Sequence, residues 1–280
     1  MFTLKIENPS GEILELTHNK NYVVDEFEFT SKARINLSDV AGMDGGLYNS
    51  SKSEPITGTI VLAPQFPIEQ NRLNLYRYFQ RGKWCRVYYS NGSIDVQIEG
   101  YVEEITPSLF SKRQTVQISI VCPKAYFEEI FESYSDISSI ISTFEIPFAI
   151  EEDGVEFSYI NHDVLATVIN EGSVDSGVII HITARGSIVN PIIYGNTFGG
   201  SMKFNIELQE TDQLIINTNS GERSVKLIRG VTETNVVNCL GDNPTWFEVF
   251  PGENVFSYDA ESGAELLSIV FRHRTKYGGI

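Results

Sequence analysis

Residues 84–101 (WCRVYYSNGSIDVQIEGY) give the clearest indication of the fold. Asn91-Gly92 lies near the centre, and this dipeptide is typical of the tight turn that joins two antiparallel strands. On both sides, β-branched and aromatic residues alternate with polar ones, as in a strand with one buried face. The stretch therefore predicts a β-hairpin with strands at residues 84–89 and 94–101.

The same alternating pattern extends outward through the first half of the chain. Gly and Asn punctuation separates the runs, and the three glycines of residues 42–46 (GMDGG) indicate a loop. The further strands predicted in this half are residues 2–6, 22–29, 33–40, 56–62 and 114–122.

One segment of the first half has helical spacing. Pro67 stands near its start and Gly82 just after its end, which is the usual punctuation of a helix. Its larger apolar residues fall on one helical face: Ile68, Leu75, Tyr76 and Phe79. We expect this face to pack on a sheet rather than to hold a cofactor.

The second half has a different composition. Five serines lie in residues 133–142, and about nine short strand patterns follow at roughly ten-residue spacing, as in a β-sandwich or jelly roll. The expected strands are residues 144–150, 155–160, 178–183, 202–208, 214–217, 225–228, 246–250, 255–258 and 266–272. Phe204, Ile206 and Phe271 are expected in their core.

We therefore predict a mainly β protein of two domains. Residues 1–133 should form a β-sandwich or barrel-like domain with one helix and a β-hairpin. Residues 134–280 should form a jelly-roll β-sandwich. With 280 residues and 41% apolar composition, the chain is long enough to bury sizeable cores without disulfides or metals.

The charge is acidic, with a formal net value of −16. Residues 1–133 carry 17 acidic and 13 basic side chains, whereas residues 134–280 carry 20 and 8. Such a surface repels phosphate backbones, so we expect no nucleic-acid binding. Four cations are close in the first half, Arg77, Arg81, Lys83 and Arg86, but packing and solvation are their expected roles.

Motifs of catalysis are missing from the sequence. It has no GxSxG, HExxH, Walker A or GxGxxG pattern and no Cys/His cluster at zinc spacing. Cys85, Cys122 and Cys239 are expected as free buried thiols, and His181 as a structural residue within a strand. We predict no catalytic, cofactor-binding or metal-binding residues, no secretory signal and no transmembrane span.

Two motifs have a second interpretation. The acidic run Glu151-Glu152-Asp153-Gly154 offers hard oxygens for calcium, although a solvated acidic turn fits its spacing better. Trp246 and Phe247 follow an acidic, Asn-containing turn and could stack on a sugar, although aromatics at a strand start are more often core.

Several segments of the first half together resemble one known family. They are residues 33–46 (ARINLSDVAGMDGG), the helix of residues 69–81 followed by the strand of residues 83–89, and residues 122–127 (CPKAYF). Their order is similar to that of the distal tail proteins of long-tailed phages that infect Gram-positive bacteria.

The second half adds three further matches. They are residues 168–172 (VINEG), residues 242–254 (DNPTWFEVFPGEN) and residues 271–277 (FRHRTKY). The last resembles the family's Arg-x-Arg-Tyr ending, although two residues separate Arg274 from Tyr277 here.

The resemblance implies a structural, non-enzymatic hub at the phage tail tip or baseplate. The first domain would form a hexameric ring, and the second would be a galectin-like sandwich that projects outward. Partners would be the tail tube protein, the tape-measure protein, the tail-tip lysin or fibre hub and receptor-binding proteins. The location would be the virion tail tip, after assembly in the bacterial cytoplasm.

Two other functions stay open at this point. The second domain could be a carbohydrate-binding module that contacts host cell-wall glycans, or the chain could be a glycan-degrading enzyme. Glycan affinity, glycan release and oligomeric state distinguish these hypotheses from the hub.

Overall fold

The chain divides into two compact units in the computed structural model, which describes residues 2–42, 44–138, 140–142, 158–160 and 165–280. The first unit is Met1–Ile130 together with Lys276–Ile280, and the second is Phe131–Thr275. The sequence assigned the last five residues to the second domain. In the structure β25 (Lys276–Tyr277) pairs with β10 (Phe127–Glu129) of the first unit.

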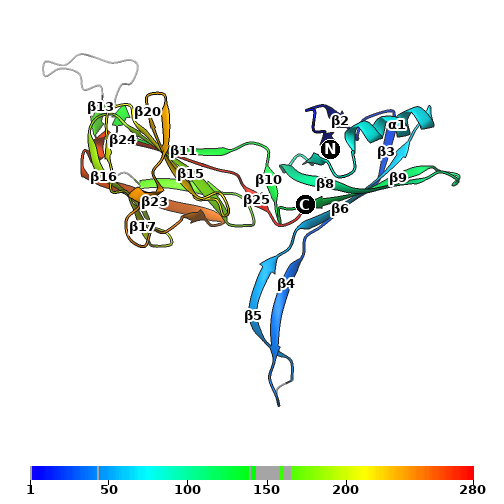
Figure 1. Ribbon diagram of the computed structural model, residues 1–280, viewed down its shortest axis with the longest axis horizontal. Helices are drawn as coiled ribbons and strands as arrows, with labels where there is room; N and C mark the ends of the chain where they lie inside the picture. The colour runs from blue at the N-terminus through cyan, green and yellow to red at the C-terminus, as the bar shows by residue number, and fades with distance from the viewer. Residues whose placement is uncertain (1, 43, 139, 143–157, 161–164) are drawn as a thin grey trace. The chain divides into compact units, whose positions relative to one another are not determined.

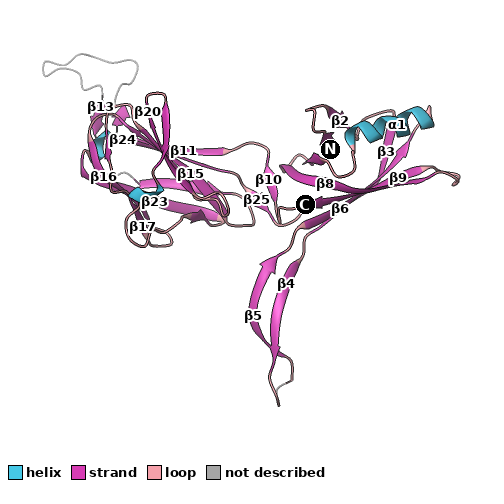
Figure 2. Ribbon diagram, viewed as in Figure 1, coloured by secondary structure: helices cyan, strands magenta, loops and turns pink. Residues whose placement is uncertain are grey.

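Strands dominate the described residues, and α1 (Ile68–Tyr78) is the one α-helix among them (Figure 2). The predicted mainly β class is therefore confirmed. All strand pairs within the described ranges are antiparallel.

The first unit contains a nine-stranded sheet in which seven strands follow the order β2-β1-β7-β8-β9-β6-β3, with β10 and β25 joined to it. The remaining bounds are β1 (Thr3–Glu7), β2 (Ile13–Glu15), β3 (Tyr22–Thr30), β6 (Ile56–Pro64), β7 (Trp84–Ser90), β8 (Asp95–Ser108) and β9 (Thr115–Cys122). Burial alternates along β8 and β9, because one face of the sheet supplies the core of the unit.

The predicted hairpin of residues 84–101 is confirmed as the β7–β8 pair, whose register runs from Trp84 opposite Tyr101 to Ser90 opposite Asp95. Gly92 has a φ of 86°, which favours glycine. The Asn91 side chain accepts hydrogen bonds from the backbone amides of Ser93 and Ile94 at 2.9 and 3.0 Å.

The predicted helix is also confirmed, although its buried face is shifted. Leu75 and Phe79 are buried, whereas Ile68 lies at the surface. Asn71 takes the inward position instead, where its side chain donates to the Gln65 carbonyl at 3.0 Å and its carbonyl accepts from the Tyr22 hydroxyl at 3.1 Å. These bonds join the helix to β3 and to the end of β6.

The second unit contains two larger sheets and a small strand pair. The first sheet comprises β11 (Ser133–Ser138), β15 (Ser176–Ala184), β19 (Gln213–Asn217), β20 (Ser224–Arg229), β21 (Thr232–Asn235), β22 (Glu248–Val249) and β24 (Leu267–His273). The second sheet comprises β14 (Leu165–Asn170), β16 (Ile188–Gly195), β17 (Ser201–Lys203), β18 (Glu207–Leu208) and β23 (Gly252–Ser262). The small pair is β12 (Ile140–Ser142) with β13 (Ser158–Ile160).

Side chains from both larger sheets form one buried cluster, which is the arrangement of a β-sandwich. Phe204 and Phe271 are fully buried in it, as predicted. Ile206 is only partly buried, so its prediction was wrong. The alternating run of residues 202–208 is not one strand, because after Phe204 the amide of Asn205 bonds to the Cys239 carbonyl instead of continuing the ladder with β16.

Only some of the strands predicted in the second half are confirmed. β15, β19, β20, β23 and β24 correspond to predicted runs, whereas residues 246–250 contain only the short β22. β16 was missed. The predicted strand of residues 144–150 and the first half of the run 155–160 lie outside the described residues, and the second half of that run is β13.

The boundary of the second unit leads to a prediction. We expect residues 131–275 to fold alone and to be about 1–3 kcal/mol more stable than residues 137–275. The shorter piece lacks the start of β11, where Ser133 to Asp136 pair with β24. Urea unfolding of the two pieces measures the difference, and equal midpoints would show that this part of β11 contributes nothing.

Candidate functional site

A two-stranded ribbon leaves the sheet of the first unit (Figure 1). We call it the arm, residues 33–53, and it consists of β4 (Ala33–Asp39) and β5 (Gly46–Ser53). These strands pair only with each other, from Ala33 opposite Ser53 to Asp39 opposite Gly46. The arm continues the β3–β6 ladder beyond Thr30 and Thr57, and the Glu54 amide donates to the Lys32 carbonyl at its base.

The described side chains of the arm are exposed on both faces, apart from Ser53 at the base, yet the two faces differ. Leu37 stands opposite Tyr48 and Ile35 opposite Ser51, and the Tyr48 hydroxyl donates to the Ser51 hydroxyl at 2.8 Å. Ile35, Leu37 and Tyr48 are each more than half exposed. We call this the apolar face of the arm.

The opposite face is more polar, although it also carries Leu47, which stands opposite Ser38 and is 51% exposed. The Asn49 side chain donates to the Ser38 hydroxyl at 2.6 Å, and the Asn36 side chain donates to the Ser50 hydroxyl at 3.3 Å. An isolated two-stranded hairpin is only marginally stable in water. The arm therefore has the properties of a segment that another chain covers.

Two other strand connections of the first unit lie around Asn91-Gly92 and at residues 107–113. The first is a tight turn that stays with the sheet, and the second is the β8–β9 connection. The sequence predicted β4, as the strand of residues 33–40, but missed β5, because residues 47–53 (LYNSSKS) are largely polar and have no alternation that marks a buried face.

A hollow of about 360 Å³ lies at the other end of the β3–β6 ladder. We call it the ladder-end hollow. The residues that line it are Val23, Ala63, Pro64, Gln65, Ile68, Ser111, Lys112, Arg113 and Gln114. Arg113 also pairs with Asp25 on β3.

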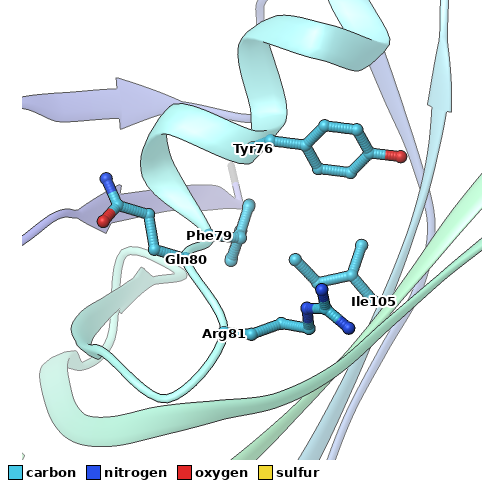
Figure 3. A pocket seen from close by; sticks show the side chains of 5 residues that line it. All are labelled: Tyr76, Phe79, Gln80, Arg81 and Ile105. Carbon is cyan, nitrogen blue, oxygen red and sulfur yellow. The ribbon is translucent and has the colours of Figure 1, made fainter.

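A second hollow, of about 410 Å³, lies beside the end of α1 (Figure 3). Tyr76 and Phe79 at the end of the helix, Gln80 and Arg81 after it and Ile105 on β8 line this space. Both hollows are open to solvent and neither is lined by an acidic residue, a histidine or a cysteine, so they suit contact with a protein surface better than catalysis.

Two of the four cations that lie close in the sequence of the first half, Arg77, Arg81, Lys83 and Arg86, form ion pairs. Arg77 pairs with Glu12 at 3.3 Å, and Arg86 pairs with Glu7 at 3.2 Å and with Glu99. Arg81 lines the second hollow instead. These residues do not form a basic patch of four free cations.

The cysteines show no sign of redox chemistry. Cys85 and Cys122 are buried, and burial raises the pKa of each thiol to about 12. Such thiols are protonated and inert at neutral pH. Cys239 is partly exposed, and burial raises its thiol pKa as well.

Trp246 and Phe247, which the sequence offered as a surface for stacking on a sugar, differ in burial. Phe247 is fully buried, and Trp246 is partly buried beneath the Arg223 guanidinium, 5.4 Å from the ring centre. The acidic run Glu151-Glu152-Asp153-Gly154 lies outside the described residues. Within the described part of the chain, no group of three His, Cys, Asp or Glu side chains could hold a metal ion, and no helix there is long and apolar enough to cross a membrane.

Two histidines of the second unit predict a pH-dependent stability. Burial lowers the pKa of His273, and burial and then Arg272 lower that of His181, opposed by Glu132. The unfolded chain then takes up protons below about pH 6.5 that the folded unit does not, so its stability falls as the pH falls through that value.

For residues 131–275, we expect the urea midpoint to be lower at pH 5 than at pH 7.5. The His273→Leu variant should show a weaker pH dependence than the unchanged unit, because its buried position can no longer be protonated. The same slope in both proteins would assign the pH dependence to other groups.

No protein-family model matches the sequence, and no curated protein does. Solved structures match over the full length. The SPP1 Dit protein, described as a paradigm of the hub adsorption apparatus in phages that infect Gram-positive bacteria, aligns with a TM-score of 0.68 and 12% identity, covering 99% of each chain. A chain of the phage P2 baseplate in its calcium-activated conformation aligns with a TM-score of 0.50 and 12% identity, covering 100% of each. The predicted resemblance to distal tail proteins is therefore confirmed for the fold.

Proposed function

We propose that this protein is a structural, non-enzymatic hub of a phage or phage-like tail tip or baseplate. The observation that carries the proposal is the full-length match to the SPP1 Dit fold. The exposed arm supports it independently, because a lone ribbon with an apolar face needs a partner surface.

The partner of the arm is a second copy of the chain in this proposal. An arm that projects from one surface and docks on a different surface of the next copy makes a head-to-tail contact, and such contacts close into rings when the rotation permits. The first unit would thus build a hexameric ring, with the apolar face of each arm covered by its neighbour.

The second unit would be a galectin-like sandwich that projects from this ring. The tail tube, tape-measure, tail-tip lysin or fibre and receptor-binding proteins are its proposed partners, as part of the virion tail tip. Its two sheets with a shared core support a rigid platform of this kind. Titration with cell-wall polysaccharide tests the alternative: a monomer with glycan affinity is a carbohydrate-binding module, whereas a ring without it is a hub.

We also expect that duplex DNA passes through the ring without binding to it. Strong electrostatic binding needs several free cations, and Arg77 and Arg86 are already paired with carboxylates. Titration of the ring with duplex DNA at about 50 mM salt should show no micromolar binding. Micromolar affinity that disappears at high salt would indicate a basic conduit wall.

A further inference from the structure

The arm and the ladder-end hollow occupy opposite ends of one pair of strands. The β3–β6 ladder runs from Tyr22 opposite Pro64 to Thr30 opposite Thr57. The arm continues from the second end, and the hollow lies at the first. A nine-residue strand spans about 30 Å, so an arm directed away from the ladder does not return to its own hollow.

The surroundings of the hollow are apolar and exposed. Val23 and Ile68 line it and are partly open to solvent. Phe66, between two lining residues, is 89% exposed, and Phe110, next to the lining residue Ser111, is fully exposed. Exposed apolar groups gathered around a hollow are typical of a surface that binds another protein.

The charges of the hollow and of the arm tip are complementary. The two charged side chains that line the hollow, Lys112 and Arg113, are both basic, and Arg113 is already paired with Asp25, so Lys112 is the cation that a partner can neutralise. The charged side chains around the tip, Asp39 and Asp44, are both acidic, and Val40 and Ala41 add small apolar surface between them. The hollow beside α1 has a single charged residue, Arg81, and therefore matches the tip less well.

We infer that the tip of the arm of one copy sits in the ladder-end hollow of the next copy of this chain. This inference rests on the proposed ring and names the surfaces that close it. Asp44 would face Lys112, while Val40 would contact the apolar rim. Every copy has one arm tip and one ladder-end hollow, at opposite ends of one ladder. Each copy can therefore dock on the next, as a closed ring requires.

Disulfide trapping between differently tagged chains tests the pairing. One chain carries Val40→Cys and the other Ser111→Cys, both in a Cys239→Ser background, with the buried Cys85 and Cys122 retained. Oxidation should join the two tagged chains, and a single chain with both substitutions should give a ladder of linked oligomers on a non-reducing gel. The matched control replaces Ser111→Cys with Gln80→Cys, in the hollow beside α1, and should give no such product.

The outcomes separate this inference from the ring itself. Rings that form without the Val40–Ser111 disulfide, or that link Val40 to position 80, would overturn the docking site and leave the ring intact. Full-length chains that neither assemble nor cross-link would overturn both. Charge exchange gives a second measurement: Asp44→Lys should weaken association about two- to five-fold at low salt, and adding Lys112→Asp should restore it. Additive losses in the double variant would contradict the pairing.

Discussion

The Phe204→Ala variant should lose about 3–5 kcal/mol of the free energy of unfolding of the second unit. The phenyl ring of Phe204 is fully buried in the cluster that both sheets share, so removing it takes apolar area from the core and leaves a cavity. The Phe204 backbone would keep its amide bond to the Pro191 carbonyl, at 2.9 Å, so the loss reports mainly on the side chain. Urea unfolding of residues 131–275 measures it.

Val231→Ala is the matched control, because that side chain is fully exposed at a turn of the same unit. Its expected change is within about 0.5 kcal/mol. A loss below about 1 kcal/mol for Phe204→Ala would mean that the Phe204 side chain does not occupy the core between the sheets.

Removal of the arm should abolish the ring while leaving the first unit folded. Replacing residues 34–52 with a short glycine-containing turn deletes side chains that contribute almost nothing to the core, since the described residues of β4 are all exposed. The β3–β6 ladder ends at Thr30 and Thr57 and keeps its register. We expect an unfolding midpoint close to that of the full chain but only monomers in sedimentation.

Point variants on the two faces of the arm provide the control. Leu37→Ser with Tyr48→Ser removes apolar surface and should disrupt assembly. Asn36→Ser with Asn49→Ser changes the opposite face and should leave assembly largely intact if that face stays in solvent. Equal effects of the two pairs would show that the apolar face has no special role, and a ring that survives arm deletion would exclude the arm from the interface.

The sequence predicted best the elements whose neighbours lie close in the chain. The β7–β8 hairpin followed from Asn91-Gly92 and alternation, and α1 followed from its punctuation. The buried face of the helix was predicted incorrectly at Asn71. This residue is polar, yet it is buried because its side-chain amide and its carbonyl form hydrogen bonds with Gln65 and Tyr22. Local sequence patterns do not reveal that a polar residue is buried with its hydrogen bonds formed inside the protein.

The elements that were missed depend on contacts distant in the sequence. β16 contains Pro191, which argues against a strand, but the chain bends there with Asn190 at a φ of 51° and pairs with β23 on either side. β5 is exposed on both faces and has no apolar alternation. The candidate docking surfaces were also beyond local patterns, because the ladder-end hollow combines residues near positions 23, 65 and 112.

The mass of the purified full-length chain over a range of protein concentrations tests the central claim most directly. The hub proposal predicts a closed species of six chains, each of 31.4 kDa, that persists on dilution and shows a central opening in electron micrographs. A monomer or dimer at every concentration would contradict the proposal that the exposed arm joins copies of this chain into a ring.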